Sequence, residues 1–300
     1  MATVRNYLSL IRFSHTIFAM PFALIGFALG VSQWAFSVIP GFRLVMYPWT
    51  DIGYLLILVI LCMVLARSAA MAFNRYLDRH FDAKNPRTAI REIPAGIISA
   101  NQTLLFTIVS SLLFVITCYF INRICFFLSP VALLVILGYS YTKRFTPLCH
   151  LVLGVGLSLA PIGAYLAVTG TFSVLPILFS CAVIFWVSGF DIIYALQDEE
   201  FDRANQLYSM PSWLGKKRAL GVSVVLHFTS AACVIVAGVI AHSGWLYWAG
   251  TTVFAGMLIY QHSIVKPDDL RKVNLAFMTA NGIASVIFAC FVIADLITHH

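Results

Sequence analysis

Long apolar segments dominate this sequence and limit the folds that it can adopt. Nine segments are each apolar over about the 20 residues that an α-helix needs to cross a bilayer. Hydrophobic residues make up 61% of the 300 residues and charged residues only 10%, too few to cover a soluble domain. We therefore expect an all-α, polytopic membrane protein with about nine transmembrane helices, forming a single domain over residues 1–300. The expected spans are approximately 14–38, 52–75, 102–121, 124–141, 149–169, 172–196, 219–241, 245–264 and 274–297.

Basic residues are distributed unevenly around these segments. Most of the 19 Lys and Arg fall at the N-terminus and in every second connection, whereas the alternate connections contain only Arg43 and Arg123. Because cytoplasmic loops carry the excess of Lys and Arg, this pattern predicts an inner-membrane protein with its N-terminus inside. The basic residues flank membrane spans and form no separate basic domain, so nucleic-acid binding is not expected.

Acidic residues are scarce and concentrated in two places. The chain has only 12, and more than half of them lie in the segments 74–82 and 191–202. Each segment holds two aspartates four residues apart, which a helix places on one face, one above the other. The segments close the second and the sixth predicted spans, so both are expected on the cytoplasmic side. The acidic residues are Asp78, Asp82, Asp191, Asp198, Glu199, Glu200 and Asp202.

Carboxylates at the end of a membrane span are costly unless they face a cavity and find cationic partners. Mg²⁺ is a suitable partner, because it takes oxygen ligands and is usually held by one or two carboxylates together with phosphate oxygens. Two converging acidic faces beside basic loops therefore indicate a site for a diphosphate and its metal ions. The basic residues expected to contact the diphosphate are Arg67, Lys84, Arg87, Arg91, Lys143 and Arg144.

Some of these residues have a second explanation. Arg67 falls within the second predicted span and is equally well explained as a buried structural partner of the acidic cluster. Lys143 and Arg144 also satisfy the charge rule for cytoplasmic loops without any ligand, although their short loop favours phosphate contact. The seven cysteines are interpreted as small buried hydrophobes, and the eight histidines show no metal-ligand spacing.

The two acidic segments also follow recognisable motifs. The first reads Asn74-Arg75-Tyr-Leu-Asp78-Arg-His-Phe-Asp82, and the second reads Asp191-Ile-Ile-Tyr194-Ala-Leu-Gln-Asp198-Glu-Glu-Phe-Asp202. Together with the nine expected spans they resemble the UbiA superfamily of intramembrane prenyltransferases, whose patterns are N-D-x-x-D-x-x-x-D and a Y-A-x-x-D element leading into D-x-x-x-D. Arg75 stands where many members have aspartate, so metal coordination through position 75 is excluded. This form is similar to that of a branch of aromatic-acid prenyltransferases.

The resemblance implies transfer of a polyprenyl group from its diphosphate to an aromatic ring, with the apolar tail running towards the lipid bilayer. Asp191, with Tyr194 nearby, is then the candidate for activating the acceptor or taking its ring proton. The best-fitting acceptor is an aromatic acid of the 4-hydroxybenzoate kind, as in ubiquinone synthesis. A dihydroxynaphthoate-type ring for menaquinone is the alternative within the family, and an ion-coupled transporter is the alternative outside it. The implied Mg²⁺ ligands are Asn74, Asp78, Asp82, Asp198 and Asp202.

Overall fold

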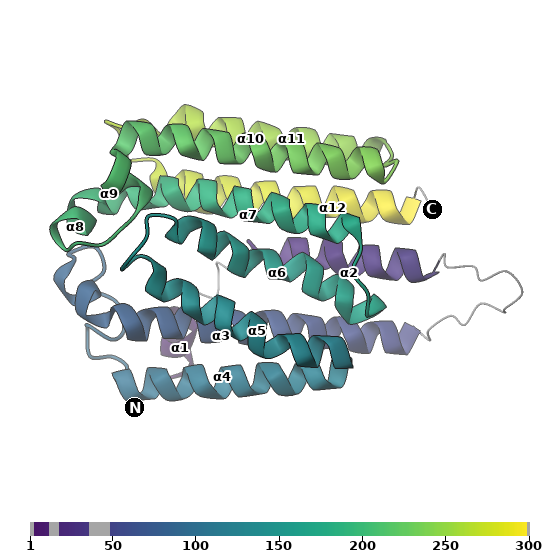
Figure 1. Cartoon of the computed structure of the whole chain (residues 1–300), viewed down its shortest axis with the longest axis horizontal. Helices are drawn as coiled ribbons and strands as arrows, with labels where there is room; N and C mark the ends of the chain where they lie inside the picture. The colour runs from purple at the N-terminus through teal and green to yellow at the C-terminus, as the bar shows by residue number, and fades with distance from the viewer. Residues whose placement is uncertain (1–2, 12–17, 36–48, 299–300) are drawn as a thin grey trace, which may run out of the picture.

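The computed structural model describes residues 3–11, 18–35 and 49–298, and the regular structure in these ranges is helical apart from one isolated β-bridge. The long helices lie side by side along one common direction (Figure 1). In chain order the helices are α1 (Val4–Leu10), α2 (Met20–Ala35), α3 (Trp49–Lys84), α4 (Ala100–Ile121), α5 (Arg123–Thr142), α6 (Cys149–Thr169), α7 (Val174–Ala195), η2 (Leu196–Asp198), α8 (Glu199–Ala204), α9 (Met210–Leu214), α10 (Lys216–Ile240), α11 (Trp245–Ile264), η3 (Leu275–Ala280) and α12 (Asn281–Thr298).

The predicted spans correspond to helices, but not all of them meet the criteria for crossing a membrane. Within the described ranges, seven helices are both long and apolar enough. Helix α2 corresponds to the predicted span 14–38, whose ends lie outside the described residues, and its apolar part is shorter. Helix α11 coincides with the predicted span 245–264 but is not among those seven, because its tryptophans, tyrosines and polar residues lower its hydropathy. The count of nine is therefore approximate.

The first acidic motif lies on a helix throughout. The predicted second span ended at residue 75, with the motif running into a loop, whereas α3 continues to Lys84 and is 36 residues long. Helix α3 therefore holds Asn74, Asp78 and Asp82 on consecutive turns of one rigid element. Because the helix continues through the motif, the residues of the first acidic cluster are spaced one helical turn apart.

Helix α7 is the centre of the bundle and carries the start of the second motif. It packs against α6 and α10, while α2 packs on α6, α3 on α4 and α11 on α12. On α7, Trp186 is fully buried and contacts the rings of Phe22 and Phe254 at centroid distances of 5.2 and 6.0 Å. The C-terminal ends of α3 and α7 lie at the end of the bundle that also carries α8 and α9 (Figure 1). The fold thus brings the two motifs to one end of the molecule.

A buried amide supports the wall next to α7. Helix α12 begins with the π-helical turn η3, and Asn281 donates to the carbonyls of Ala276 and Phe277 at 3.2 and 3.0 Å. Its side-chain oxygen accepts hydrogen bonds from Trp186 Nε1 at 2.9 Å and Gln261 Nε2 at 2.8 Å. These bonds tie α7, α11 and α12 together and hold Phe277 beside Tyr194.

Close helix packing depends on Gly26. A Cβ atom at this position would lie 2.0 Å from the carbonyl oxygen of Pro161, which belongs to the backbone of α6. We expect Gly26→Ala to destabilise the protein by about 1–3 kcal/mol, measured as a lower melting temperature in detergent. Gly221→Ala is the matched control, because a Cβ there meets nothing within 4 Å. Equal melting temperatures for the two variants would contradict this account of the α2–α6 contact.

Candidate active site

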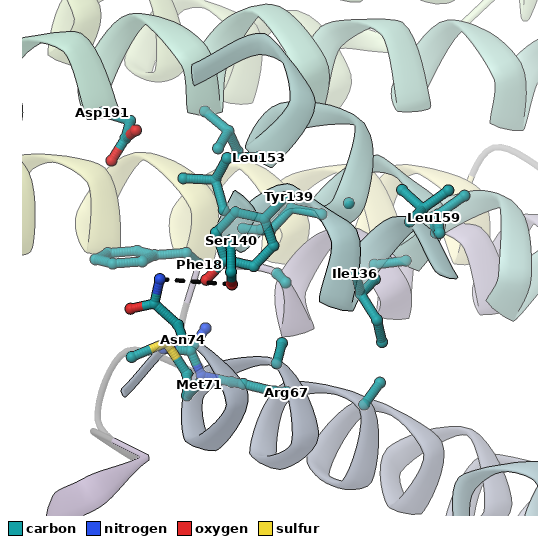
Figure 2. Close-up of a pocket in the computed structure, with 18 of the residues that line it drawn as sticks. Phe18, Arg67, Met71, Asn74, Ile136, Tyr139, Ser140, Leu153, Leu159 and Asp191 are labelled. Carbon is teal, nitrogen blue, oxygen red and sulfur yellow. Dashed lines mark hydrogen bonds between the residues drawn. The ribbon is translucent and has the colours of Figure 1, made fainter. Parts of the chain in front are cut away.

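A cavity of about 660 Å³ runs along the inside of the bundle. Its polar end is lined by residues of both acidic segments, and its other reaches are apolar and extend to Ile121 and Phe172. Figure 2 shows Asn74 and Asp191 on opposite sides of the polar part, with Ile136 and Leu159 farther along the cavity. The space is therefore amphipathic, with charged groups at one end and room for an apolar chain beyond them.

Asp78 is the most buried acid at the polar end and is held by three side chains. Its carboxylate is 2% exposed and pairs with Lys143 Nζ at 2.8 Å and Arg144 Nη2 at 3.4 Å. Asn74 donates to the same carboxylate at 3.2 Å and to Ser140 Oγ at 3.5 Å. The turn after α5 thus neutralises the first acidic cluster across the cavity.

Asp82, one turn further along α3, is paired with the loop that follows that helix. Arg91 Nη1 lies 2.6 Å from Asp82 Oδ1, and Thr88 Oγ1 donates to the Asp82 carbonyl at 3.1 Å. The second carboxylate oxygen, Oδ2, is buried and has no hydrogen-bond partner among the described residues. A buried carboxylate oxygen without a partner is unfavourable unless a ligand satisfies it.

Asp198 belongs to the second motif and is paired with the same loop. Arg87 Nε donates to Asp198 Oδ1 at 3.0 Å, its Nη2 pairs with Oδ2, and Asn85 Nδ2 donates to Oδ1 at 3.1 Å. Arg87 Nη1 also donates to the Tyr194 hydroxyl at 2.9 Å. Burial lowers the pKa of Arg87, but the hydrogen bonds and charge of Asp198 outweigh it, so this pKa lies above its ordinary value. One arginine therefore links the loop after the first acidic segment to the second acidic segment.

The second motif is not one continuous helix. The sequence predicted the aspartate pair of this motif on one helical face. In the structure, Asp191 and Tyr194 lie on α7, which ends at Ala195, whereas Asp198 ends the 3₁₀ turn η2 and Asp202 lies on α8. All four residues nevertheless line the cavity. Asp202 accepts a hydrogen bond from Ser209 Oγ at 2.9 Å, which ties α8 to the start of α9.

Asp191 lies on the opposite wall from α3 and is paired with a histidine. His150 Nδ1 is 2.7 Å from Asp191 Oδ2, and the Asp191 side chain is 24% exposed. Tyr194, one turn later on α7, packs on Phe277 with ring centroids 4.3 Å apart. Asp191, Tyr194 and Phe277 thus form a wall of the cavity with one acid and two aromatic rings.

Four of the six predicted basic residues line the cavity, and two do not. Arg87, Arg91 and Lys143 line the cavity, whereas Arg144 touches Asp78 without lining it. Arg67 lines the cavity two turns before Asn74, and its Nε is buried without a hydrogen-bond partner among the described residues. Lys84 is exposed and does not line the cavity.

The oxygen atoms at the polar end suit a hard divalent cation, although they do not form a closed metal site. Among the described residues, no group of three His, Cys, Asp or Glu side chains is placed to hold a metal ion. Asp78, Asp82 and Asp198 are instead neutralised by Lys143, Arg91 and Arg87, as described above. Carboxylate and amide oxygens, with the unpartnered Asp82 Oδ2, are the donor chemistry that Mg²⁺ requires.

Sequence reasoning missed three residues of this site. His150 contacts Asp191, Asn85 contacts Asp198 and Ser209 contacts Asp202. Asn85 directly follows the first motif, so its position in the chain was a usable signal. No pattern in the sequence marked His150 or Ser209, because each acts on an acid from a different helix.

Comparison with known proteins assigns the chain to a family. A model of the UbiA prenyltransferase family matches residues 19–283, a range that includes both acidic segments. The chain belongs to the UbiA prenyltransferase family. The predicted family and the predicted enzyme class, a prenyltransferase, are therefore confirmed, and this UbiA member is an integral membrane protein.

Individual relatives cover most of the chain. The 4-hydroxybenzoate octaprenyltransferase of Nitrosomonas eutropha is 30% identical over 243 residues, which cover 81% of this chain and 85% of that protein. The apo structure of a UbiA homolog from Aeropyrum pernix K1 has a TM-score of 0.77 at 29% identity, covering 95% of this chain and 98% of the other. A UbiA homolog from Archaeoglobus fulgidus bound to DMAPP and Mg²⁺ has a TM-score of 0.71 at 20% identity, covering 98% and 99%. These likenesses confirm the predicted all-α fold.

Proposed function

We propose that this UbiA member transfers a polyprenyl group from its diphosphate to an aromatic acid of the 4-hydroxybenzoate kind, in quinone biosynthesis. The observation that carries the proposal is one cavity lined by both acidic clusters and Asp191 at its polar end and by apolar residues beyond. The activity named for the Nitrosomonas eutropha relative and the ligands of the Archaeoglobus fulgidus homolog support it. Because the cavity is lined by residues from Phe18 to Phe277, we treat residues 1–300 as one domain.

The diphosphate would bind between the two acidic clusters. Mg²⁺, when bound there, would neutralise the diphosphate and stabilise it as a leaving group. Arg87, Arg91 and Lys143, which contact the carboxylates in the structure, are within one side chain's reach of the same space and would turn to phosphate oxygens. Arg144 would keep Asp78 in place through its contacts with α3. The proposed metal ligands are Asn74, Asp78, Asp82, Asp198 and Asp202.

The prenyl tail would occupy the apolar length of the cavity, and the acceptor would lie next to Asp191. Asp191 would take the proton that the acceptor loses when the new bond forms, with Tyr194 beside it. The rings of Tyr194 and Phe277 would shelter positive charge that develops on the allylic carbon. Arg67, with its unpartnered Nε, is available for an anionic group of either substrate.

We place the polar end of the cavity on the cytoplasmic side of the inner membrane, with the N-terminus inside. The support is the gathering of basic residues in the loops beside the two motifs, because positively charged loops stay in the cytoplasm. Lys143 and Arg144 after α5 and Arg87 and Arg91 after α3 belong to this group. Water-soluble diphosphate product would then leave directly into the cytoplasm.

A turnover assay tests the proposal. Purified protein in detergent, given Mg²⁺, an isoprenyl diphosphate and 4-hydroxybenzoate, is expected to release diphosphate and form a prenylated aromatic acid, detected by mass spectrometry. A parallel reaction with dihydroxynaphthoate reports the alternative acceptor class, and a reaction with EDTA reports the metal requirement. Absence of product with every acceptor, together with ion flux in liposomes, would favour the transporter alternative.

A further inference from the structure

His150, at the start of α6, is a buried residue with both ring nitrogens engaged. It is 3% exposed and lines the same cavity as Asp191. Its Nδ1 lies 2.7 Å from Asp191 Oδ2 on α7, and its Nε2 lies 3.2 Å from the backbone nitrogen of Met210 on α9. Its carbonyl accepts a hydrogen bond from Ser188 Oγ at 3.1 Å. The ring and its backbone are therefore held by two neighbouring helices.

These contacts define where the ring carries its proton. A backbone N–H can only donate, so Nε2 of His150 accepts the hydrogen bond from Met210 and carries no proton. In the neutral ring the proton is then on Nδ1, which donates to Asp191 Oδ2. His150 is thus a single, fixed hydrogen-bond donor aimed at the one carboxylate on this wall of the cavity.

The hydrogen bond from His150 uses Oδ2 of Asp191 and leaves Oδ1 available to a ligand. Among the described residues, His150 is the hydrogen-bond partner recorded for this carboxylate, through Oδ2. The side chain is partly exposed and lines the cavity, across from Asn74 (Figure 2). A carboxylate anchored through one oxygen cannot rotate freely, so its second oxygen keeps a defined direction.

We propose that His150 is the positioning residue for Asp191, orienting its free oxygen towards the acceptor. The inference rests on the proposed function. In that reaction the allylic C–O bond breaks with its electron pair leaving on the diphosphate, and the new carbon–carbon bond forms to the ring. The ring proton then passes to Oδ1 of Asp191, while the Nδ1 proton of His150 stays in place.

The same contact joins Asp191 to the second acidic cluster. Ser209 donates to Asp202 at 2.9 Å and caps α9, whose first residue is Met210. Met210 in turn donates to His150, and His150 donates to Asp191. The base for the acceptor and an acid at the diphosphate end are therefore connected through three hydrogen bonds and the peptide bond between Ser209 and Met210.

Two substitutions separate this role from simple packing. His150→Phe fills a similar volume without a donor, and we expect kcat to fall roughly 10²-fold, since small misplacements at a reacting centre have effects of that size. The KM for the prenyl diphosphate should change by less than about twofold, because binding of that substrate does not use Asp191. His150→Gln supplies an N–H for Asp191 and an oxygen for the Met210 N–H, so it should recover most of the rate. An unchanged kcat in His150→Phe, or an equal loss in both variants, would overturn the proposal.

A double variant and a buried control complete the kinetic test. Asp191→Asn removes the base, so adding His150→Phe should cause no further loss; an additional loss as large as that of the single variant would refute positioning through Asp191. His227→Gln is the control, because His227 is 2% exposed, contacts His262 at 2.9 Å and lies outside the residues that line the cavity. We expect it to keep the wild-type kcat.

Histidine nitrogen NMR of the whole protein in detergent gives a readout independent of turnover. The expected His150 signal is that of a neutral ring protonated at Nδ1, and it should shift in Asp191→Asn. A ring protonated at Nε2 would overturn the proposal. An inactive wild type would refute the proposed function and the catalytic use of this pair. An active wild type with an unaffected His150→Phe would refute only the positioning role.

Discussion

Replacing Asp78 with asparagine is expected to lower kcat by roughly 10³-fold, the scale seen when charge stabilisation is lost at a reacting centre. The carboxylate is 2% exposed and balances Lys143 and Arg144. Asparagine has nearly the same shape as aspartate but no charge. The variant therefore binds a divalent cation more weakly than the wild type and cannot neutralise the two basic side chains. Prenylated product formed per minute, normalised to protein that elutes as a folded species in detergent, measures the effect.

Asp295→Asn is the matched control for this experiment. Asp295 is 5% exposed, lies on α12 outside the cavity lining, and accepts hydrogen bonds from the backbone nitrogens of Gly244 and Tyr247 at 2.8 and 3.2 Å. We expect this variant to lose about 1–3 kcal/mol of stability through an unsatisfied hydrogen bond, while its kcat stays near the wild-type value. Comparable losses of kcat in both variants would show that the effect of Asp78→Asn reflects the fold.

The second large effect is expected at Arg87, which joins the loop after the first motif to the second motif. Arg87→Met should raise the KM for the prenyl diphosphate by about 10–100-fold, because hydrogen bonds to charged groups contribute about 1.5–3 kcal/mol each. The variant removes the contacts with Asp198 and with the Tyr194 hydroxyl. Initial rates over a range of diphosphate concentrations at saturating acceptor measure this change.

Arg203→Met provides the comparison. Arg203 also pairs with an acid of the second motif, Glu199, at 2.8 Å, but its side chain is 62% exposed and it lies outside the cavity lining. Exposed ion pairs contribute about 0–1 kcal/mol, so we expect the KM of this variant to stay within about twofold of the wild-type value. A KM for Arg87→Met that is no higher than that for Arg203→Met would contradict a diphosphate role for Arg87.

Lys84 shows where helical geometry was decisive. It follows Asp82 by two residues, and residues two apart on a helix point to nearly opposite sides. Because α3 continues to Lys84, this lysine is exposed while Asp82 lines the cavity. The sequence prediction ended the span at residue 75, within the motif, and placed Lys84 in the loop after it, where the lysine was free to reach the diphosphate. The longer helix removes that freedom.

The sequence by itself determined the class of the protein and the location of its charge. Apolar runs of about 20 residues require a membrane, and buried carboxylates are so costly in lipid that two aspartate pairs stand out against the rest of the chain. Both pairs do line one cavity. This part was predictable because the length of a helix and the spacing of its faces are local properties.

Only the tertiary structure decided which partner neutralises each acid. Arg87 reaches Asp198 across 111 residues of chain, and His150 reaches Asp191 across 41. No local rule selects these pairs, because they depend on how α6, α7 and the loop after α3 pack at one end of the bundle. A desolvated carboxylate needs a partner, and only the folded chain determines which side chain comes within hydrogen-bonding distance.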